Sequence, residues 1–132
     1  MTDEMKALAA RCMAGAHDGT MSFPQIVGAL MADGFDGYFV DYRTGMATYY
    51  GTDGSAHAVA MAHRYEAVAQ AFDTAEVQAA IRHAQRGAVD YSYDGFNARV
   101  TAAGCAGYLV SLSGRRVVYL ARSGETHVEM MP

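Results

Sequence analysis

The chain has 132 residues, 52% of them hydrophobic and 18% charged, so we expect one domain with a packed core and exclude a disordered chain. The formal net charge is −4, and the ten basic residues comprise one lysine and nine scattered arginines, which argues against nucleic acid as a partner. No apolar run reaches the roughly 18–20 residues that span a bilayer, and the N-terminus shows no signal pattern, so we expect a cytoplasmic protein that does not use a membrane.

Two helices are predicted first. One covers about residues 3–15 and is expected to end at Gly15. The next begins at Ser22, whose hydroxyl can cap the helix while Gln25 reaches back to the cap, and it ends at Gly34. Each helix carries an apolar stripe at helical spacing, made of Met5, Leu8, Ala9 and Cys12 in the first and Ile26, Val27, Leu30 and Met31 in the second.

Three short strands follow, over residues 38–42, 46–50 and 56–60, and glycine-containing turns separate them. Residues 61–72 then join the two halves of the chain, and their alanine-rich composition suits a partly helical segment. Alternation places three side chains of the first strand on one face, namely Tyr38, Val40 and Tyr42.

The second half repeats this order. A helix is predicted over 73–86, and another runs from Ser92 or Asp94 to Gly104. Asp73, followed by Glu76, resembles a capping box. Strands follow over 108–112, 116–120 and 126–130. At a shift of 70 residues nine positions are identical: Ser22/Ser92, Ala32/Ala102, Gly34/Gly104, Gly37/Gly107, Tyr38/Tyr108, Val40/Val110, Tyr49/Tyr119, Gly54/Gly124 and His57/His127.

We interpret this recurrence as an internal duplication. The single domain, residues 1–132, then consists of two repeats, about 1–60 and 71–132, joined by 61–70. The expected fold is α+β: a helix–helix–β-meander unit occurs twice about a pseudo-twofold axis, and antiparallel sheet or sheets carry helices packed largely on one face.

The histidines kept in both halves, His57 and His127, are the first candidates for a site. Their apolar strand neighbours suggest that both point away from the core. If they met near a twofold axis, they could bind a transition metal or act as acid and base. The alternative is that each histidine only bonds a turn or a neighbouring strand. The candidate pocket comprises His57, His127, Tyr49, Tyr119, Glu125, Glu129 and Arg115.

Other residues have structural and functional interpretations that stay open. The nine tyrosines suit amphipathic strand positions, or else line a groove or an oligomer interface. Arg115 and Arg116 replace Gly45 and Met46 of the first half, which indicates a solvated turn or an anion site. Cys12 and Cys105 have no CxxC partner and are interpreted as reduced core thiols. No metal, nucleotide or nucleophile motif is present, so we predict no cofactor.

Four stretches together resemble a known family. They are Ala102–Ser111, Gly114–Tyr119 and Ser123–Glu129 in the second half, and Tyr38–Gly54 in the first. The chain is similar over nearly its whole length to bacterial proteins grouped as a domain of unknown function, number 1398. Some members are labelled phage envelope protein, which implies a virion or prophage context. The resemblance implies no activity, and the alanine-rich segment 60–72 departs from the more proline-rich linker that it implies.

These observations favour a small non-enzymatic binding or protein-interaction module, whose partner is a small molecule or a protein. They are also compatible with a homo-oligomer. The alternative is an enzyme or metal-binding protein whose pocket centres on His57 and His127. The two hypotheses differ in one distance, because two imidazoles more than about 8 Å apart can hardly serve one metal or one substrate. A phage structural protein is a third interpretation, which predicts self-assembly into large particles.

Overall fold

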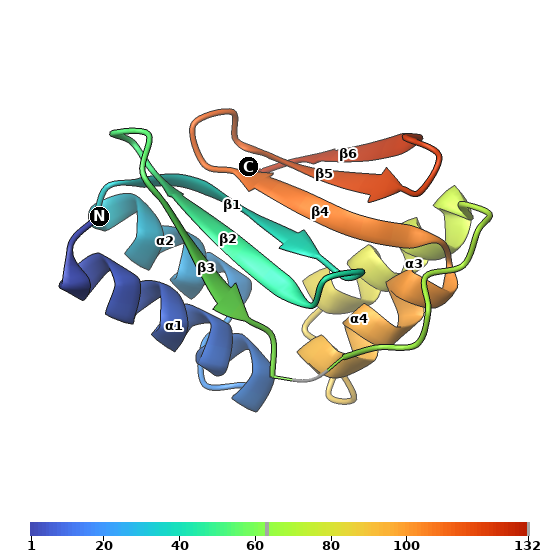
Figure 1. The fold of residues 1–132 in the computed structure, drawn as a ribbon. Helices are drawn as coiled ribbons and strands as arrows, with labels where there is room; N and C mark the ends of the chain where they lie inside the picture. The colour runs from blue at the N-terminus through green and yellow to red at the C-terminus, as the bar shows by residue number, and fades with distance from the viewer. Residues whose placement is uncertain (63, 132) are drawn as a thin grey trace.

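The computed structural model describes residues 1–62 and 64–131. Within these residues, four helices lie on one face of a six-stranded antiparallel sheet, which confirms the α+β class (Figure 1). In chain order the elements are α1 (Asp3–Asp18), α2 (Phe23–Ala32), β1 (Phe35–Asp41), β2 (Met46–Gly51), β3 (Ala56–Ala60), α3 (Thr74–Gln85), α4 (Tyr93–Ala102), β4 (Cys105–Ser111), β5 (Arg116–Ala121) and β6 (Thr126–Met130).

The strands are ordered β3-β2-β1-β4-β5-β6, so each half supplies three neighbouring strands and β1 pairs with β4 at the centre. The two central backbones approach each other closely at two glycines. A Cβ atom on Gly37 would lie 2.5 Å from the carbonyl oxygen of Val110, and one on Gly107 would lie 2.5 Å from that of Val40. Both positions therefore require glycine, which explains why these residues match in the two halves.

The first helix runs further than expected, since α1 continues through Gly15 to Asp18. Gly19, with a φ of 79°, occupies the left-handed conformation that ends the helix. Gly15 serves packing instead: a Cβ atom there would lie 2.6 Å from Cγ of Met21. A glycine inside a helix can thus mark a close contact as well as an end.

The expected capping box of α2 is confirmed. The backbone N–H of Gln25 donates to Oγ of Ser22 at 3.3 Å, and Oε1 of Gln25 accepts from the Ser22 N–H at 2.8 Å. At α3 only half of the box forms. Asp73 caps the N–H of Glu76, whereas the Glu76 carboxylate accepts instead from Nε of Arg99 at 2.7 Å. That ion pair joins α3 to α4.

The segment between the halves is not helical in its described part, residues 61–62 and 64–72. Its backbone bonds other segments: the N–H of Ala69 donates to the Thr101 carbonyl at 3.1 Å, and that of Asp73 to the Ala103 carbonyl at 2.8 Å. Because these N–H groups donate to carbonyls at the end of α4, they cannot form the hydrogen bonds of a local helix. The side chain of Val68 is also buried here.

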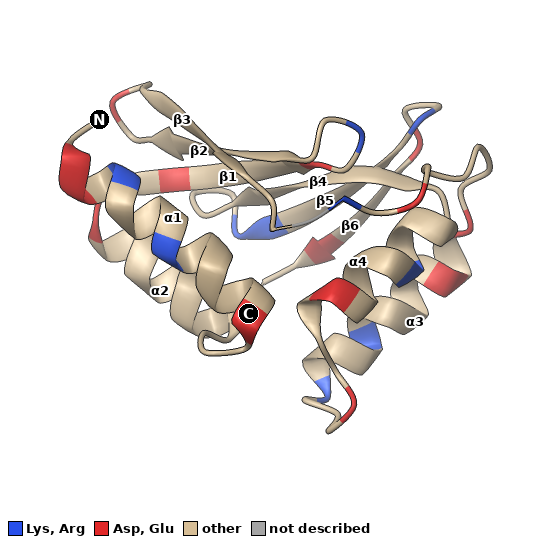
Figure 2. Ribbon diagram, turned by 60° about the horizontal axis from the view of Figure 1, so that its bottom comes forward, with Lys and Arg blue, Asp and Glu red and all other residues tan. Residues whose placement is uncertain are grey.

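The helices form two pairs, α1 with α2 and α3 with α4, which Figure 2 shows in front of the sheet. Apolar side chains from both pairs pack on the sheet face that carries Tyr38, Val40 and Tyr42, as alternation predicted. No helix of the described residues has the length and apolar character needed to cross a bilayer.

Candidate functional site

A cavity of about 900 Å³ lies beneath the sheet, lined by side chains from both helix pairs and from strands of both halves. Close-packed protein interiors contain few voids larger than a water molecule. Ligand-binding sites, by contrast, typically occupy about 300–1,000 Å³. The volume therefore marks this cavity as a candidate binding site and not as a packing defect.

A row of four tyrosines in ring contact forms the floor of the cavity. Tyr49 on β2 pairs across the ladder with Tyr38 on β1, and Tyr108 on β4 pairs with Tyr119 on β5. The ring centroids are 5.0 Å apart for Tyr38 and Tyr49, 6.4 Å for Tyr38 and Tyr108, and 5.7 Å for Tyr108 and Tyr119. Since direct cross-strand partners share a face, the alternation of each strand brings all four rings to the helix side.

The hydroxyls of this floor are of two kinds. That of Tyr108 lies 2.6 Å from the hydroxyl of Tyr93 on α4. The hydroxyls of Tyr38, Tyr49 and Tyr119 have no hydrogen-bond partner among the described residues. No fully buried polar side-chain atom of the described part is unpaired, so these three oxygens must reach the open space of the cavity. Burial raises the pKa of each of the three phenols, which keeps them neutral.

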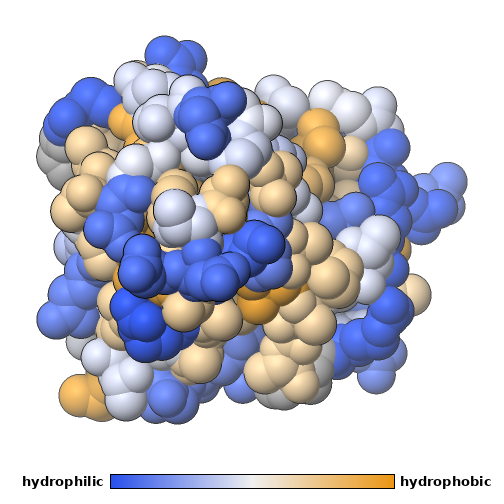
Figure 3. Space-filling view, turned by 60° about the vertical axis from the view of Figure 1, so that its left-hand side comes forward, coloured by the Kyte–Doolittle hydropathy of each residue, from blue (hydrophilic) through white to orange (hydrophobic). Residues whose placement is uncertain are grey.

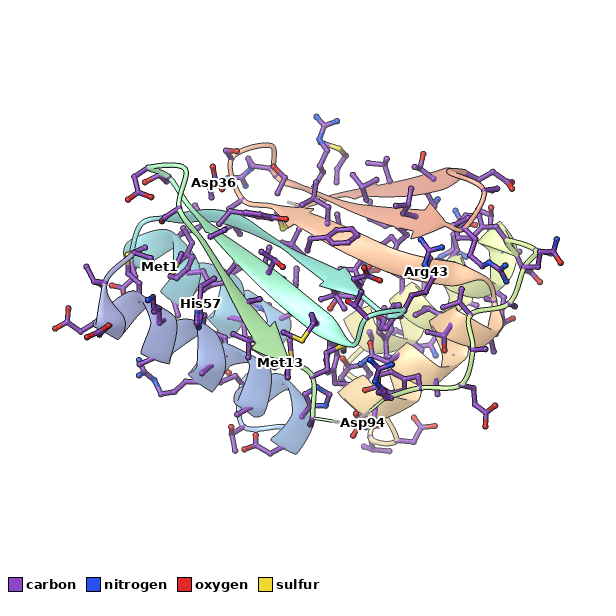
Figure 4. All side chains as sticks on the ribbon, in the orientation of Figure 1. Met1, Met13, Asp36, Arg43, His57 and Asp94 are labelled. Atoms are coloured by element: carbon purple, nitrogen blue, oxygen red, sulfur yellow. The ribbon has the colours of Figure 1, made fainter. Side chains whose placement is uncertain are left out.

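A partly buried hydrogen-bond network lies between α1 and α4, beside the cavity that its member His17 lines. Nδ1 of His17 lies 2.9 Å from Oδ1 of Asp94, which also accepts from the Tyr65 hydroxyl at 2.7 Å. Asn97 donates to that hydroxyl at 2.9 Å and accepts from the Tyr42 hydroxyl at 2.6 Å. Figure 4 shows Asp94 near the C-terminal end of α1. The network ties together four separate segments of the chain.

The opposite border of the cavity carries exposed hydrophobic side chains. Phe23 is 42% exposed, Tyr91 38% and Met130 60%, and all three line the cavity. Elsewhere, on the side of the molecule viewed in Figure 3, hydrophilic side chains interrupt the hydrophobic ones. At this border the three side chains offer hydrophobic contacts to an apolar molecule.

The charged lining is sparse and acidic. Among the described residues no lysine or arginine lines the cavity, and the carboxylates are those of Asp18 and Glu129. Asp18 accepts from the Thr20 hydroxyl at 2.6 Å, and this bond lowers its pKa. Oε1 of Glu129 lies 2.8 Å from Nε2 of His127. Each carboxylate thus has a polar neighbour on one oxygen, Oδ1 of Asp18 and Oε1 of Glu129.

The structure does not bring the two repeated histidines together. His57 lies on β3 and His127 on β6, the opposite edges of the sheet, so five strand intervals of about 4.8 Å put them roughly 24 Å apart. A common metal or acid–base centre does not form. No group of three or more His, Cys, Asp or Glu side chains within the described part could hold a metal ion.

Both histidines also lie on the face opposite to the expected one. His57 pairs with Tyr49 and His127 with Tyr119, so they share the helix side with the tyrosines, as Figure 4 shows for His57 beside α1. Their apolar neighbours, such as Val128, lie on the outer face of the sheet, where Val128 is exposed. Apolar residues on an edge strand did not indicate the core side here.

The other five residues of the predicted pocket divide between the cavity lining and turns outside it. Tyr49, Tyr119 and Glu129 line the cavity, whereas Glu125 and Arg115 lie in turns away from it. Glu125 accepts from the Ser123 hydroxyl at 2.7 Å. Arg115 adopts a φ of 52° in the β4–β5 turn, at the position where the first half has Gly45 with a φ of 73°.

Sequence reasoning missed several residues of the site. Tyr38 and Tyr108 carried a signal, because they match between the halves and alternate onto the core face, but they were not placed in the candidate pocket. Tyr93 and His17 carried none, since their contacts depend on how the helix pairs pack. Cys12 lines the cavity as a buried thiol whose pKa burial raises, and burial raises the pKa of Cys105 to about 11.

Fold and cavity together define a small α+β protein with a six-stranded sheet, two helix pairs on one face and a tyrosine-floored cavity between them. The family model described as protein of unknown function (DUF1398) matches residues 15–129, and the chain belongs to this family. The resemblance noted in the sequence is thereby confirmed. No curated protein matches the chain.

Proposed function

We propose that the protein is a non-enzymatic binding module that holds an apolar small molecule in the cavity between its helix pairs. The observation that carries this proposal is the cavity of about 900 Å³ with its floor of four tyrosines. A ligand that buries about 250 Å² of apolar surface there would gain roughly 6 kcal/mol, at about 25 cal/mol per Å², before the entropic costs of association.

The chemistry of the lining supports binding over catalysis. Burial raises the pKa of the Cys12 thiol, so it lacks the thiolate that a nucleophile needs. Both ring nitrogens of His17 have neighbours: Nδ1 lies beside Asp94, and Nε2 accepts from the Ala62 N–H at 3.4 Å. A general base needs a ring nitrogen that can reach the substrate. His57, the other acid–base candidate of the first half, lies at a sheet edge outside the cavity lining.

We also infer that the cavity arose through an internal duplication of the chain. Support comes from equivalent backbone features 70 residues apart: Met61 N–H donates to the Gly45 carbonyl at 2.9 Å, and Met131 N–H donates to the Arg115 carbonyl at 2.8 Å. Each half also supplies two of the four floor tyrosines. A site at the junction of two repeats would arise once the duplicated units shared one sheet.

A cytoplasmic location also belongs to the proposal. The two cysteines are unpaired, which suits a reducing compartment.

Native mass spectrometry of untagged protein would report both a retained molecule and the oligomeric state. An added mass that is not a covalent modification of either cysteine would support a bound ligand. Particles of many copies would favour the phage structural interpretation instead.

The cavity is tested directly by filling it. Ala84 on α3 lines the cavity, whereas Ala75 on the same helix is exposed and does not. We expect the neutral dye Nile red to bind the native protein, with a blue shift of its fluorescence emission. The dye should bind the Ala75→Trp variant equally well, and it should not bind the Ala84→Trp variant. Binding that survives Ala84→Trp would place the dye elsewhere, and no binding to the native protein would contradict the proposed function.

A further inference from the structure

We propose that the natural ligand is an uncharged, largely apolar molecule carrying hydroxyl or carbonyl oxygens that the hydroxyls of Tyr38, Tyr49 and Tyr119 hydrogen-bond. This inference rests on the proposed function and specifies the chemistry of its ligand. It predicts discrimination against carboxylates, phosphates and ammonium ions that share the same apolar part.

The row of tyrosine hydroxyls favours a ligand that forms hydrogen bonds without carrying a charge. Tyr38 and Tyr49 stack with an interplanar angle of 25°, so their ring faces largely cover each other and their polar tips remain to meet a ligand. Among the described residues, neither hydroxyl has a hydrogen-bond partner, and the same holds for Tyr119. A phenol both donates and accepts, so a neutral ligand oxygen can pair with any of the three. Polar groups inside an apolar cavity are the usual determinants of ligand orientation.

The charge of the cavity lining disfavours an ionised ligand. An anion buried there would find no lysine or arginine among the described lining residues, and Glu129 and Asp18 would repel it. A cation would have to compete for carboxylates that already bond His127 and Thr20. Burying a charge without a partner is far more costly than burying a hydrogen-bonded neutral group.

Two helices direct their N-termini at the cavity. The first turns of α2 and α4, at Phe23 and Tyr93, border the cavity, and helix N-termini carry partial positive charge. Their capping residues Ser22 and Ser92 already accept backbone N–H groups. What remains is a weak field that favours an electron-rich oxygen over a cation, whereas discrimination against anions rests on the acidic lining without lysine or arginine among the described residues.

Size completes the description of the ligand. At about 30 Å³ for each water-sized group, a cavity of about 900 Å³ has room for on the order of 30 non-hydrogen atoms. The exposed Phe23, Tyr91 and Met130 at its border would accommodate any apolar part that extends beyond it.

The experiment compares four probes with one apolar part: 4-butylphenol, butylbenzene, 4-butylbenzoate and 4-butylbenzylammonium, each measured by displacement of Nile red at pH 7. We expect 4-butylphenol to bind about tenfold more tightly than butylbenzene, and both charged probes to bind at least tenfold more weakly than the phenol. Equal or tighter binding of either charged probe would overturn the inference, and so would equal affinity of the phenol and the hydrocarbon.

Conservative variants locate the effect. The triple change Tyr38→Phe, Tyr49→Phe and Tyr119→Phe should abolish the preference for 4-butylphenol and leave the affinity for butylbenzene unchanged. Because these hydroxyls have no protein partner among the described residues, their removal leaves no orphaned group and should not unfold the protein. Tyr50→Phe, on the outer face of β2, is the matched control and should change neither affinity.

The two proposals fail in different ways. If Nile red does not bind the native protein, or if its binding survives Ala84→Trp, the cavity is not the site and the proposed function is wrong. If the dye binds the cavity but the phenol preference persists in the triple phenylalanine variant, the binding function stands and the assignment of the ligand contacts is overturned.

Discussion

Replacing Asn97 tests how the network between α1 and α4 contributes to stability. Asn97 is 0% exposed, accepts from the Tyr42 hydroxyl at 2.6 Å and donates to the Tyr65 hydroxyl at 2.9 Å. In Asn97→Ala both bonds are lost. The Tyr42 hydroxyl belongs to a side chain that is only 6% exposed, and it has no other hydrogen-bond partner in the described part of the chain.

The magnitude follows from these bonds. A buried hydrogen bond contributes about 1 kcal/mol net, and a hydroxyl left buried without a partner costs about 1–3 kcal/mol. We expect Asn97→Ala to lower the free energy of unfolding by about 3 kcal/mol. For a chain of 132 residues this corresponds to a decrease in Tm of roughly 12 °C. Gln70→Ala removes an exposed amide and should change stability by less than about 0.5 kcal/mol.

A double-mutant cycle separates the network from simple loss of packing. Tyr42→Phe removes the orphaned hydroxyl, so the double variant should be about 1–2 kcal/mol more stable than the sum of the single effects predicts. Urea unfolding followed by circular dichroism measures all four proteins. Additivity within about 0.3–0.5 kcal/mol would refute the reasoning, because the two side chains would then not be energetically coupled.

Three further predictions concern packing and pH. In urea unfolding, Gly15→Ala should destabilise the protein by about 1–3 kcal/mol, because the new Cβ atom would lie 2.6 Å from Cγ of Met21. Gly28→Ala should stabilise the protein by about 0.5–1 kcal/mol, because a Cβ atom at this helix position has nothing within 4 Å. Gly107→Ala should be destabilising by more than about 2 kcal/mol in the same assay, since its Cβ would meet a carbonyl oxygen of β1 that cannot move aside; stability near that of the native protein would contradict the β1–β4 register. Burial raises the pKa of the Cys105 thiol from 9.0 to about 11, and the unfolded chain therefore releases this proton first. The stability that this group contributes is complete below pH 9 and is lost towards pH 11, so urea midpoints should fall over that range, and a rise would contradict the assigned burial.

Local features of the fold were predictable from sequence because each depends on a few neighbouring residues. The capping box at Ser22 and the strand at 56–60 require only local hydrogen bonds and alternation, and both are present. Gly15 was misjudged because the contact that demands glycine comes from Met21, beyond the helix. The segment 61–72 was misjudged because the carbonyls that hold it belong to the end of α4.

The site was less predictable for the same reason. Tyr49 and Tyr119 could be selected because they match at the 70-residue shift and because strand alternation applies to both. His57 and His127 matched equally well, yet this matching cannot tell which strands form the edges of the sheet. A cavity depends on how far apart the helix pairs pack, and no pattern in the sequence encodes that distance.

The asymmetry of the cavity follows from where the two halves differ. On the α1–α4 side, Asp94 and Asn97 hold the hydrogen-bond network. The positions 70 residues earlier are Pro24 and Val27, which have no side-chain hydrogen-bonding group and cannot form the same network. The side on which Phe23 is exposed therefore lacks this network. If the halves began as copies, the shared tyrosines made the floor, and later divergence placed the network on one side and left the other bordered by hydrophobic residues.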